Sequence, residues 1–210
     1  MQHCEPSVAP STPLAADRGH ESCLPWDLVH VVRCSVAMTA IASIIVGCGG
    51  SSSSAANAPL SPASGTPALL VESPDLAGGT VAREVTCDGA NRAPSVRWSA
   101  SPTASAAVVE LLDPDAPGGT FVHWLAIASG ADAASGVLHT PAVEGRNDFG
   151  ANGYGGPCPP SGQTHHYHLV VTTYGTPLNL ASGFTAADLN AAVSGHAALG
   201  RGEVVGSYGR

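Results

Sequence analysis

Two carboxylates lie close together in a turn-forming segment of the sequence. Asp113 and Asp115 belong to DPDAPGG, which directly follows the apolar run 106–112. Loops at the end of a strand often carry binding groups, and carboxylates there can orient a histidine or meet an ammonium group. Asp, Pro and Gly are also the ordinary residues of a surface turn. The segment alone therefore fits both a binding loop and a plain turn.

A histidine interrupts the next apolar run, TFVHWLAIA at residues 120–128. Successive side chains of a strand point to opposite faces of the sheet. This alternation divides the run into Phe121, His123, Leu125 and Ile127 on one face and Val122, Trp124 and Ala126 on the other. His123 is then either a hydrogen-bonded core residue or a ligand-binding residue, because its ring nitrogens need partners in both cases.

The run HHYHLVVTTY at residues 165–174 carries three more histidines. Alternation places His165 and Tyr167 on one face of a strand, and His166 and His168 on the other. An H-x-H pair can bind a transition metal, but such a site needs a third ligand, and nothing nearby in the sequence supplies one. We therefore predict no metal at this pair.

A loop rich in glycine and proline, GYGGPCPPSG at residues 153–162, separates these two runs. Glycines let the backbone approach other atoms closely, and prolines fix its path. Backbone N–H groups turned inward in such a loop can hold an anion without lysine or arginine. The alternative is a structural loop that covers the edge of a sheet.

The elements that must position these residues are predicted to be mostly strands. From residue 67 onward, short apolar runs alternate with Gly, Pro, Asn and Asp clusters, which is typical of an all-β domain. The run EVVGSY at 203–208 predicts a last strand. One helix is predicted, with Thr185 and Asp188 as its start signal and Leu189, Ala192, Val193 and His196 along one face. The predicted fold is mainly β, with a C-terminal helix.

The N-terminal part differs from the rest of the chain. Residues 1–34 show no helical or strand periodicity and are predicted to be unstructured. Residues 35–47 form an uncharged run of the length of a signal-peptide core, too short to span a bilayer as a helix. The sequence IVGC at its end resembles the lipobox of bacterial lipoproteins, in which the cysteine, here Cys48, is lipidated. A tether rich in Ser, Ala, Pro and Gly follows.

These features predict three parts of the chain. They are a leader with a lipoprotein signal peptide at 1–47, the lipidated Cys48 and its tether at 48–66, and a globular domain at 67–210. The mature protein is then anchored by lipid to the membrane of a bacterial cell envelope, outside the cytoplasm. In that oxidising compartment Cys87 and Cys158 can form a disulfide, and two free buried thiols are the alternative.

The composition excludes several functions. The chain has 8 Lys and Arg against 16 Asp and Glu, a formal charge of −8 that argues against nucleic-acid binding. All the cations are arginines, so a Schiff-base or P-loop lysine is excluded. The sequence contains no G-x-S-x-G, H-E-x-x-H or Walker A motif. We therefore predict a protein that is not an enzyme and has no cofactor.

Five segments of the chain form a longer pattern. They are TCDG at 86–89, RWS at 97–99, DPDAPGGTFVHW at 113–124, GRNDFGANGYGGPCPPSG at 145–162 and HHY at 165–167. Together these segments resemble the phosphatidylethanolamine-binding protein family, and in particular its bacterial branch of Raf kinase inhibitor-like proteins. The resemblance implies a Greek-key β-sandwich with an attached C-terminal helix, and one small pocket that binds phosphate-bearing groups.

The resemblance also implies which residues form that pocket. Carried over motif by motif, they are Asp113, Asp115, His123, the backbone of Gly155, Gly156 and Pro157, His165 and Tyr167. His166 stands where the family usually has arginine, which changes the outer wall of the pocket. Tyr208 is a further candidate for closing it.

We therefore expect a non-enzymatic binding module for a small phosphate-containing ligand or a phospholipid head group. Because histidines and carboxylates line the expected pocket, binding should strengthen as the pH falls through the histidine range. An inhibitor or regulatory partner of an envelope protease is the alternative, since eukaryotic relatives bind kinases and proteases. A weak His/Asp hydrolase is a third hypothesis, because Ser161 lies four residues before His165.

Overall fold

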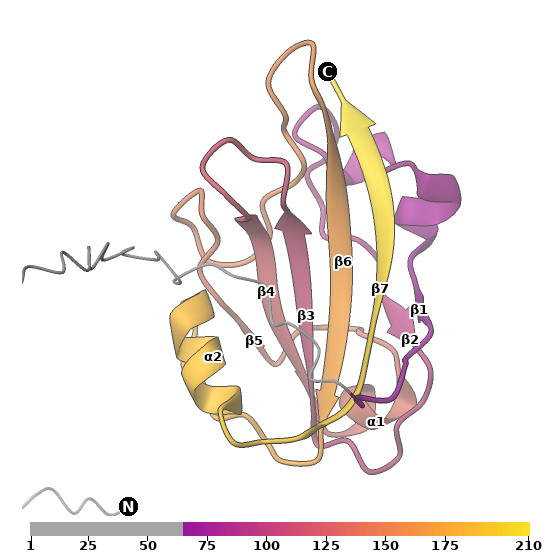
Figure 1. Cartoon of the computed structure of the whole chain (residues 1–210), viewed down its shortest axis with the longest axis vertical. Coiled ribbons are helices and arrows are strands. Elements are labelled where there is room, and N and C mark those ends of the chain that lie inside the picture. The colour runs from indigo at the N-terminus through magenta and orange to yellow at the C-terminus, as the bar shows by residue number, and fades with distance from the viewer. Residues whose placement is uncertain (1–64) are drawn as a thin grey trace, which may run out of the picture. The chain divides into compact units, whose positions relative to one another are not determined.

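A five-stranded antiparallel sheet forms the centre of residues 65–210, the part of the chain that this computed structural model describes (Figure 1). Its strands lie in the order β5 (Val143–Glu144), β4 (Phe121–Ser129), β3 (Ala106–Asp113), β6 (Thr164–Tyr174) and β7 (Ala198–Gly209). β3, β4 and β5 follow one another in the sheet, and β6 returns to pair with the free side of β3. This is the strand order of a Greek key. The predicted mainly β, Greek-key fold is confirmed.

Both faces of this sheet are covered. Every residue of β3 is buried, because its side chains enter two separate hydrophobic clusters. Val109 and Leu111 belong to one cluster together with Leu169 of β6. Val108 belongs to the other, together with Ile127 of β4. A strand buried on both faces needs a nearly continuous apolar sequence, which explains the run AAVVELL in β3.

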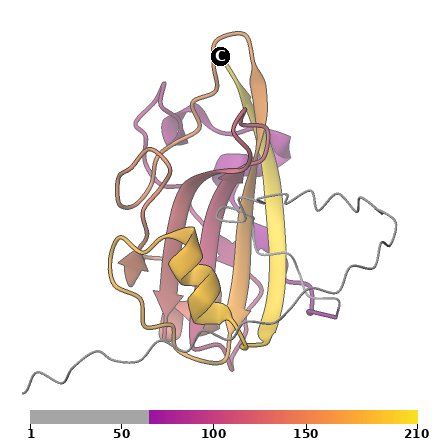
Figure 2. The same ribbon diagram turned by 60° about the vertical axis from the view of Figure 1, so that its left-hand side comes forward.

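The helix α2 (Ala186–Val193) covers one of these faces (Figure 2). It begins with the predicted capping box, in which Thr185 Oγ1 accepts a hydrogen bond from the Asp188 N–H and Asp188 Oδ2 accepts one from the Thr185 N–H. Leu189 and Val193 are buried in the cluster on that face. The amphipathic character of α2 therefore attaches it to the sheet.

α2 is shorter than the apolar repeat in the sequence predicts. It ends at Val193, and Gly195 has a φ of +80°, a left-handed conformation that suits a helix terminus. His196 therefore lies outside the helix, where its Nδ1 is 3.0 Å from Thr176 Oγ1. β7 follows α2 and begins at Ala198, well before the predicted start at Glu203. It pairs with the whole length of β6.

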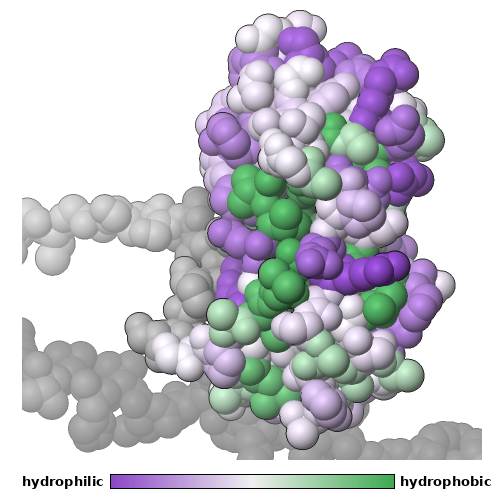
Figure 3. Space-filling view, turned by 90° about the vertical axis from the view of Figure 1, so that its right-hand side faces the viewer, coloured by the Kyte–Doolittle hydropathy of each residue, from purple (hydrophilic) through white to green (hydrophobic). Residues whose placement is uncertain are grey.

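The second layer of the sandwich is small and packs on the other face of the sheet. It contains β1 (Val71–Glu72), β2 (Arg97–Trp98), the 3₁₀ helices η2 (Pro74–Gly79) and η3 (Arg83–Val85), and the short helix α1 (Ala131–Ser135). β1 pairs with β2, and Trp98 enters the cluster beneath them. On the outer side toward β7 and η2, hydrophobic and hydrophilic residues are interspersed (Figure 3).

The predicted leader, Cys48 and most of the tether lie outside the described residues. Within residues 65–210, no helix is long and apolar enough to cross a membrane. The lipid anchor and the boundary between residues 47 and 48 therefore stay predictions from the sequence.

Glu110 is a buried carboxyl in the middle of β3. Its side chain is 5% exposed, and its Oε2 lies 3.9 Å from Arg201 Nη1 with no hydrogen bond to any residue of 65–210. Burial raises the pKa of Glu110 to about 7 from an ordinary value of 4.5, although the charge of Arg201 lowers it in part. As the pH rises between these values, the unfolded chain loses this proton while the folded protein retains it.

We therefore predict that Glu110 makes the free energy of unfolding fall as the pH rises from 4.5 to about 7. Glu110→Gln removes the titrating group, so it should exceed the wild type in stability at pH 8 by about 2–3 kcal/mol and differ little at pH 5. Urea unfolding at both pH values measures this. Glu72→Gln, at an exposed position, is the control. An unchanged pH dependence in Glu110→Gln contradicts the prediction.

Candidate anion-binding site

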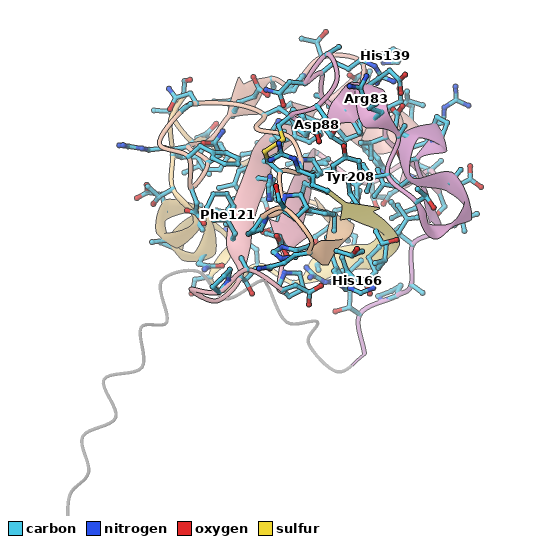
Figure 4. The ribbon with its side chains drawn as sticks, turned by 90° about the horizontal axis from the view of Figure 1, so that it is seen from above. Arg83, Asp88, Phe121, His139, His166 and Tyr208 are labelled. Carbon is cyan, nitrogen blue, oxygen red and sulfur yellow. A yellow bond between two sulfur atoms is a disulfide. The ribbon has the colours of Figure 1, made fainter. Side chains whose placement is uncertain are left out.

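The residues that could bind a ligand meet at one end of the main sheet. β3 and β7 end there, and β4 and β6 begin there. The loop between β3 and β4, the segment that leads into β6, and the end of β7 therefore lie together. Figure 4 looks onto this end and shows the disulfide with Phe121, His166 and Tyr208 around it.

A β-bulge in β4 determines the face of the sheet to which the side chain of His123 points. Leu111 of β3 pairs with Trp124, but the next residue, Leu112, pairs with Val122. His123 is therefore an extra residue with no partner in β3. Such a bulge changes the face that neighbouring side chains take, and bulges often occur beside functional sites.

Because of this bulge, the side chains of β4 do not alternate as the sequence predicted. The sequence pattern grouped His123 with Leu125 and Ile127, but these two apolar residues lie in the cluster beneath α2. Val122 joins them there. His123 turns to the opposite face, where its ring contacts that of Tyr167 at a centroid distance of 5.3 Å. The prediction was wrong because simple alternation holds only in an unbroken ladder.

His123 is fixed by hydrogen bonds with Gly155 and by aromatic neighbours. Its Nδ1–H donates to the Gly155 carbonyl at 2.6 Å, and the Gly155 N–H donates to the His123 carbonyl at 2.9 Å. The rings of Phe121 and Phe149 lie 5.0 and 5.3 Å from the imidazole. Burial lowers the pKa of His123, although the bond to Gly155 and the charge of Asp113 raise it in part. His123 therefore favours its neutral form, with Nε2 left to meet a ligand.

Asp113 and His165 form a buried pair. Nδ1 of His165 lies 2.7 Å from Asp113 Oδ2, and each side chain is only 5% exposed. The other ring nitrogen, Nε2, lies 3.1 Å from Oε1 of Gln163. Because the carboxylate accepts the Nδ1–H, it fixes the orientation of the imidazole.

A cavity of about 160 Å³ opens between these groups. Its polar walls are Asp113, His123 and His165. Its remaining walls are mostly apolar: Ala116, Pro117, Phe121, Phe149, Cys158, Pro159 and Pro160. A space of this size suits one compact polar group rather than a large ligand.

Asp115 lies outside this cavity, although it is close to Asp113 in sequence. Its Oδ2 accepts hydrogen bonds from the backbone N–H and the Nδ1–H of His166 at 2.8 and 2.7 Å. These bonds lower the pKa of Asp115. The side chains of Asp115 and His166 are 41% and 59% exposed. The two residues therefore form an outer rim, on the side where the family resemblance leads one to expect arginine.

The glycine loop is closely packed rather than open. The N–H of Gly155 donates to His123, and the N–H of Gly156 donates to Asn91 Oδ1 at 2.8 Å. Because both N–H groups are engaged, they do not form the anion-binding nest that the sequence suggests. Glycine is needed there for close approach, since a Cβ at Gly156 would lie 2.4 Å from the Val85 carbonyl oxygen.

A disulfide joins two segments around the site. Cys87 and Cys158 are bonded, with their Cα atoms 5.4 Å apart, so the alternative of two free thiols is not found. The Cys87 N–H also donates to the carbonyl of Pro157 at 3.1 Å. Tyr208 is not one of the residues that line the cavity. Its hydroxyl donates to Asp88 Oδ2 at 2.8 Å. These contacts tie the 86–89 segment to the proline-rich loop and to β7.

Tyr167 lies beneath the cavity rather than in its wall. It is fully buried, and it shares one hydrophobic cluster with Leu169 and Val171, which confirms the alternation predicted for β6. Its hydroxyl makes no hydrogen bond with the described residues, and burial raises its pKa. Tyr167 therefore supports the ring of His123 from below.

Sequence reasoning missed several residues of this site. Phe149 and Phe121 form the aromatic wall, and Gln163 meets His165. The only sequence signal for Phe149 is an aromatic residue inside the polar segment GRNDFG.

No group of three His, Cys, Asp or Glu residues within 65–210 is placed to hold a metal ion. His168 faces Glu203, at 3.2 Å.

The two carboxylates of the DPDAP turn provide a matched test of burial. Asp113→Ala leaves the buried Nδ1–H of His165 without its partner, so we predict a loss of about 2–4 kcal/mol in the free energy of unfolding. Asp115→Ala removes a contact that is largely exposed to solvent, so a loss below about 1 kcal/mol is expected. Chemical denaturation of both variants checks this. Equal losses contradict the placement of Asp113 in the interior.

Comparison with known proteins relates this geometry to a family. The family model for phosphatidylethanolamine-binding proteins matches residues 72–209. A UPF0098 protein of Pyrococcus abyssi is 43% identical over 136 residues, which cover 60% of this chain and 76% of that protein. A Mycobacterium tuberculosis protein named "Putative lipoprotein LppC" is 32% identical over 196 residues, covering 86% of this chain and 97% of its own length. The latter match covers more of the chain than residues 65–210 provide, so it extends into the segment before them.

Solved structures agree with this assignment. CT736 of Chlamydia trachomatis, described as a homologue of phosphatidylethanolamine-binding proteins, has a TM-score of 0.61 at 25% identity and covers 69% of this chain and 99% of its own. YbcL of Escherichia coli, described as a member of the mammalian family of that name, has a TM-score of 0.56 at 28% identity, with coverages of 68% and 98%. The chain belongs to the phosphatidylethanolamine-binding protein family.

Proposed function

We propose that this chain is a non-catalytic binding protein, held at the outer face of a bacterial membrane, whose cavity takes a small phosphate-bearing ligand or a phospholipid head group. The observation that carries the proposal is the cavity itself. Two imidazoles and one carboxylate, His123, His165 and Asp113, converge on a space of about 160 Å³. Both imidazoles are already oriented by hydrogen bonds with the protein, so a ligand meets groups that need little rearrangement.

The imidazole of His123 supplies the affinity for phosphate. Its Nδ1–H is committed to the Gly155 carbonyl, so a second proton can only reside on Nε2. The protonated ring then donates Nε2–H to a phosphate oxygen and carries a positive charge beside it. Because burial lowers the pKa of His123, this proton is taken up at low pH or on binding of an anion.

Asp113 gives the cavity a site for positive charge. It lies in the same wall as the imidazoles, and it is buried, so its field acts with little screening by solvent. An ammonium group attached near the phosphate meets this carboxylate. A zwitterionic head group therefore satisfies the site better than a free anion, which the carboxylate repels.

Binding rather than catalysis is favoured by how the polar groups are used. The hydrogen bonds of His165 run to Asp113 and Gln163. No hydrogen bond joins Ser161 to His165 among the described residues, and Ser161 is exposed. A hydrolase with a serine nucleophile would need that contact.

The location at a membrane is proposed from the sequence and from one relative. Residues 45–48 resemble a lipobox, and the M. tuberculosis relative carries the name of a lipoprotein. A lipid on Cys48 would hold the domain within the length of the 48–66 tether from the head groups.

Binding should depend on His123 and on pH. We predict that glycerophosphoethanolamine gives saturable NMR shifts at His123, His165 and Gly155 in the purified chain, and that its affinity rises severalfold from pH 8 to pH 5. The phosphodiester keeps one charge over this range, so the change reports groups of the protein. His123→Ala should abolish the shifts, and the control His166→Ala, on the outer rim, should keep them. Affinity that is constant or that increases with pH would falsify this mechanism.

Anchoring should depend on Cys48 alone. We predict that Cys48→Ser, expressed in a bacterial host that processes lipoproteins, abolishes incorporation of labelled fatty acid and moves the protein from the detergent phase to the aqueous phase. Cys34→Ser changes a cysteine upstream of the predicted cleavage point and is expected to behave as the wild type. Retention of fatty acid in Cys48→Ser would refute the lipid anchor.

A further inference from the structure

A second cavity of about 260 Å³ adjoins the first. Phe149 and Cys158 line both, so the two cavities have a common wall. The other lining residues of the second cavity are Cys87, Asn91, Asn147, Ala151, Tyr154, Gly155 and Gly156. The proposed function assigns no role to this space.

Most hydrogen-bonding groups of the polar side chains in the second cavity are already engaged. Asn91 and Asn147 accept hydrogen bonds from the N–H groups of Gly156 and Ala151 at 2.8 and 3.1 Å. The hydroxyl of Tyr154 donates to a backbone carbonyl. What the walls offer to a ligand is therefore an aromatic ring, the disulfide, a methyl group and glycine backbone. These surfaces favour an apolar occupant over a charged one.

Phe149 is the partition between the two cavities. Its ring lies against Gly155, where a Cβ would be 2.5 Å from a ring carbon, and edge-on to His123 and Phe121. The residue is nevertheless 55% exposed to solvent. Because this exposure leaves the ring room to turn outward, a rotation about its side-chain torsions would join the two spaces.

Each cavity alone is smaller than the volume of about 300–1,000 Å³ that is typical of small-ligand pockets, and the two together reach it. We propose that the second cavity is a subsite for a flat apolar substituent of the same ligand whose phosphate lies between His123 and His165. The inference rests on the proposed function and names the ligand class more closely. That class is a phosphate ester with an aryl or similarly compact apolar group attached directly to the ester oxygen, since the two spaces share a wall made by Phe149 and Cys158.

The test compares methyl phosphate with phenyl phosphate at pH 5, where both carry mainly one charge. In the full chain, phenyl phosphate should bind about tenfold more tightly, as expected for burial of an apolar ring. Its addition should shift the amide signals of Ala151 and Gly156, which methyl phosphate leaves unchanged. Ala151→Phe fills the subsite, so it should remove the preference and retain the affinity for methyl phosphate. Ala191→Phe, at an exposed position of α2, is the matched control and should keep the preference.

A direct contact in the wild type makes the test independent of any variant. Nuclear Overhauser effects between the phenyl protons and the Ala151 methyl group are expected. If methyl phosphate binds but phenyl phosphate binds no more tightly, or if no such effect is seen, the subsite is refuted and the proposed function remains. If neither ester binds the wild type at millimolar concentration but glycerophosphoethanolamine does, the subsite is refuted and the proposed function remains. If none of the three compounds binds, the proposed function fails as well.

Discussion

The site depends on one extra residue in β4. The main sheet is buried on both faces, so a side chain in regular alternation along its central strands enters a hydrophobic cluster. Asp113 and His165 reach the site at the strand ends, on the face of Leu111 and Tyr167. His123 comes from within β4 and reaches the same face only because the register shifts beside it. Without that bulge, its imidazole would be directed into the cluster beneath α2, far from the carboxylate.

Placing polar groups in a buried position has further consequences for the chain. A buried imidazole needs hydrogen-bond partners, and the surrounding segments supply at least one to each of the two rings. Gly155 comes close enough to bind His123 through both of its backbone groups, and Gln163 faces His165. The disulfide from Cys87 and the proline-rich path after Gly156 keep these partners in place. The loop that the sequence suggested as an anion nest therefore serves to orient the imidazoles instead.

The sequence predicted the fold and part of the site, and the differences have identifiable causes. Alternation was correct in β6 around His165 and Tyr167, where its pairing with β7 is uninterrupted. It was wrong around His123, because a bulge depends on the register of the neighbouring strand, and no residue in the run TFVHWLAIA signals it. The capping box at Thr185 was correct because it is local. The different burial of Asp113 and Asp115 was not predictable, since it depends on their tertiary partners: Asp113 meets the buried His165 and Asp115 the exposed His166.

If His123 meets an anion in the cavity, the pKa of its imidazole must change on binding. The most direct test is the pKa of His123, measured by NMR from its ring proton signals with and without saturating glycerophosphoethanolamine. We expect a pKa below the ordinary histidine value in the free protein, because burial lowers it, and a clear rise in the complex, because the bound phosphate favours the protonated ring. A His123 pKa that stays the same when the ligand binds would show that His123 does not contact the phosphate.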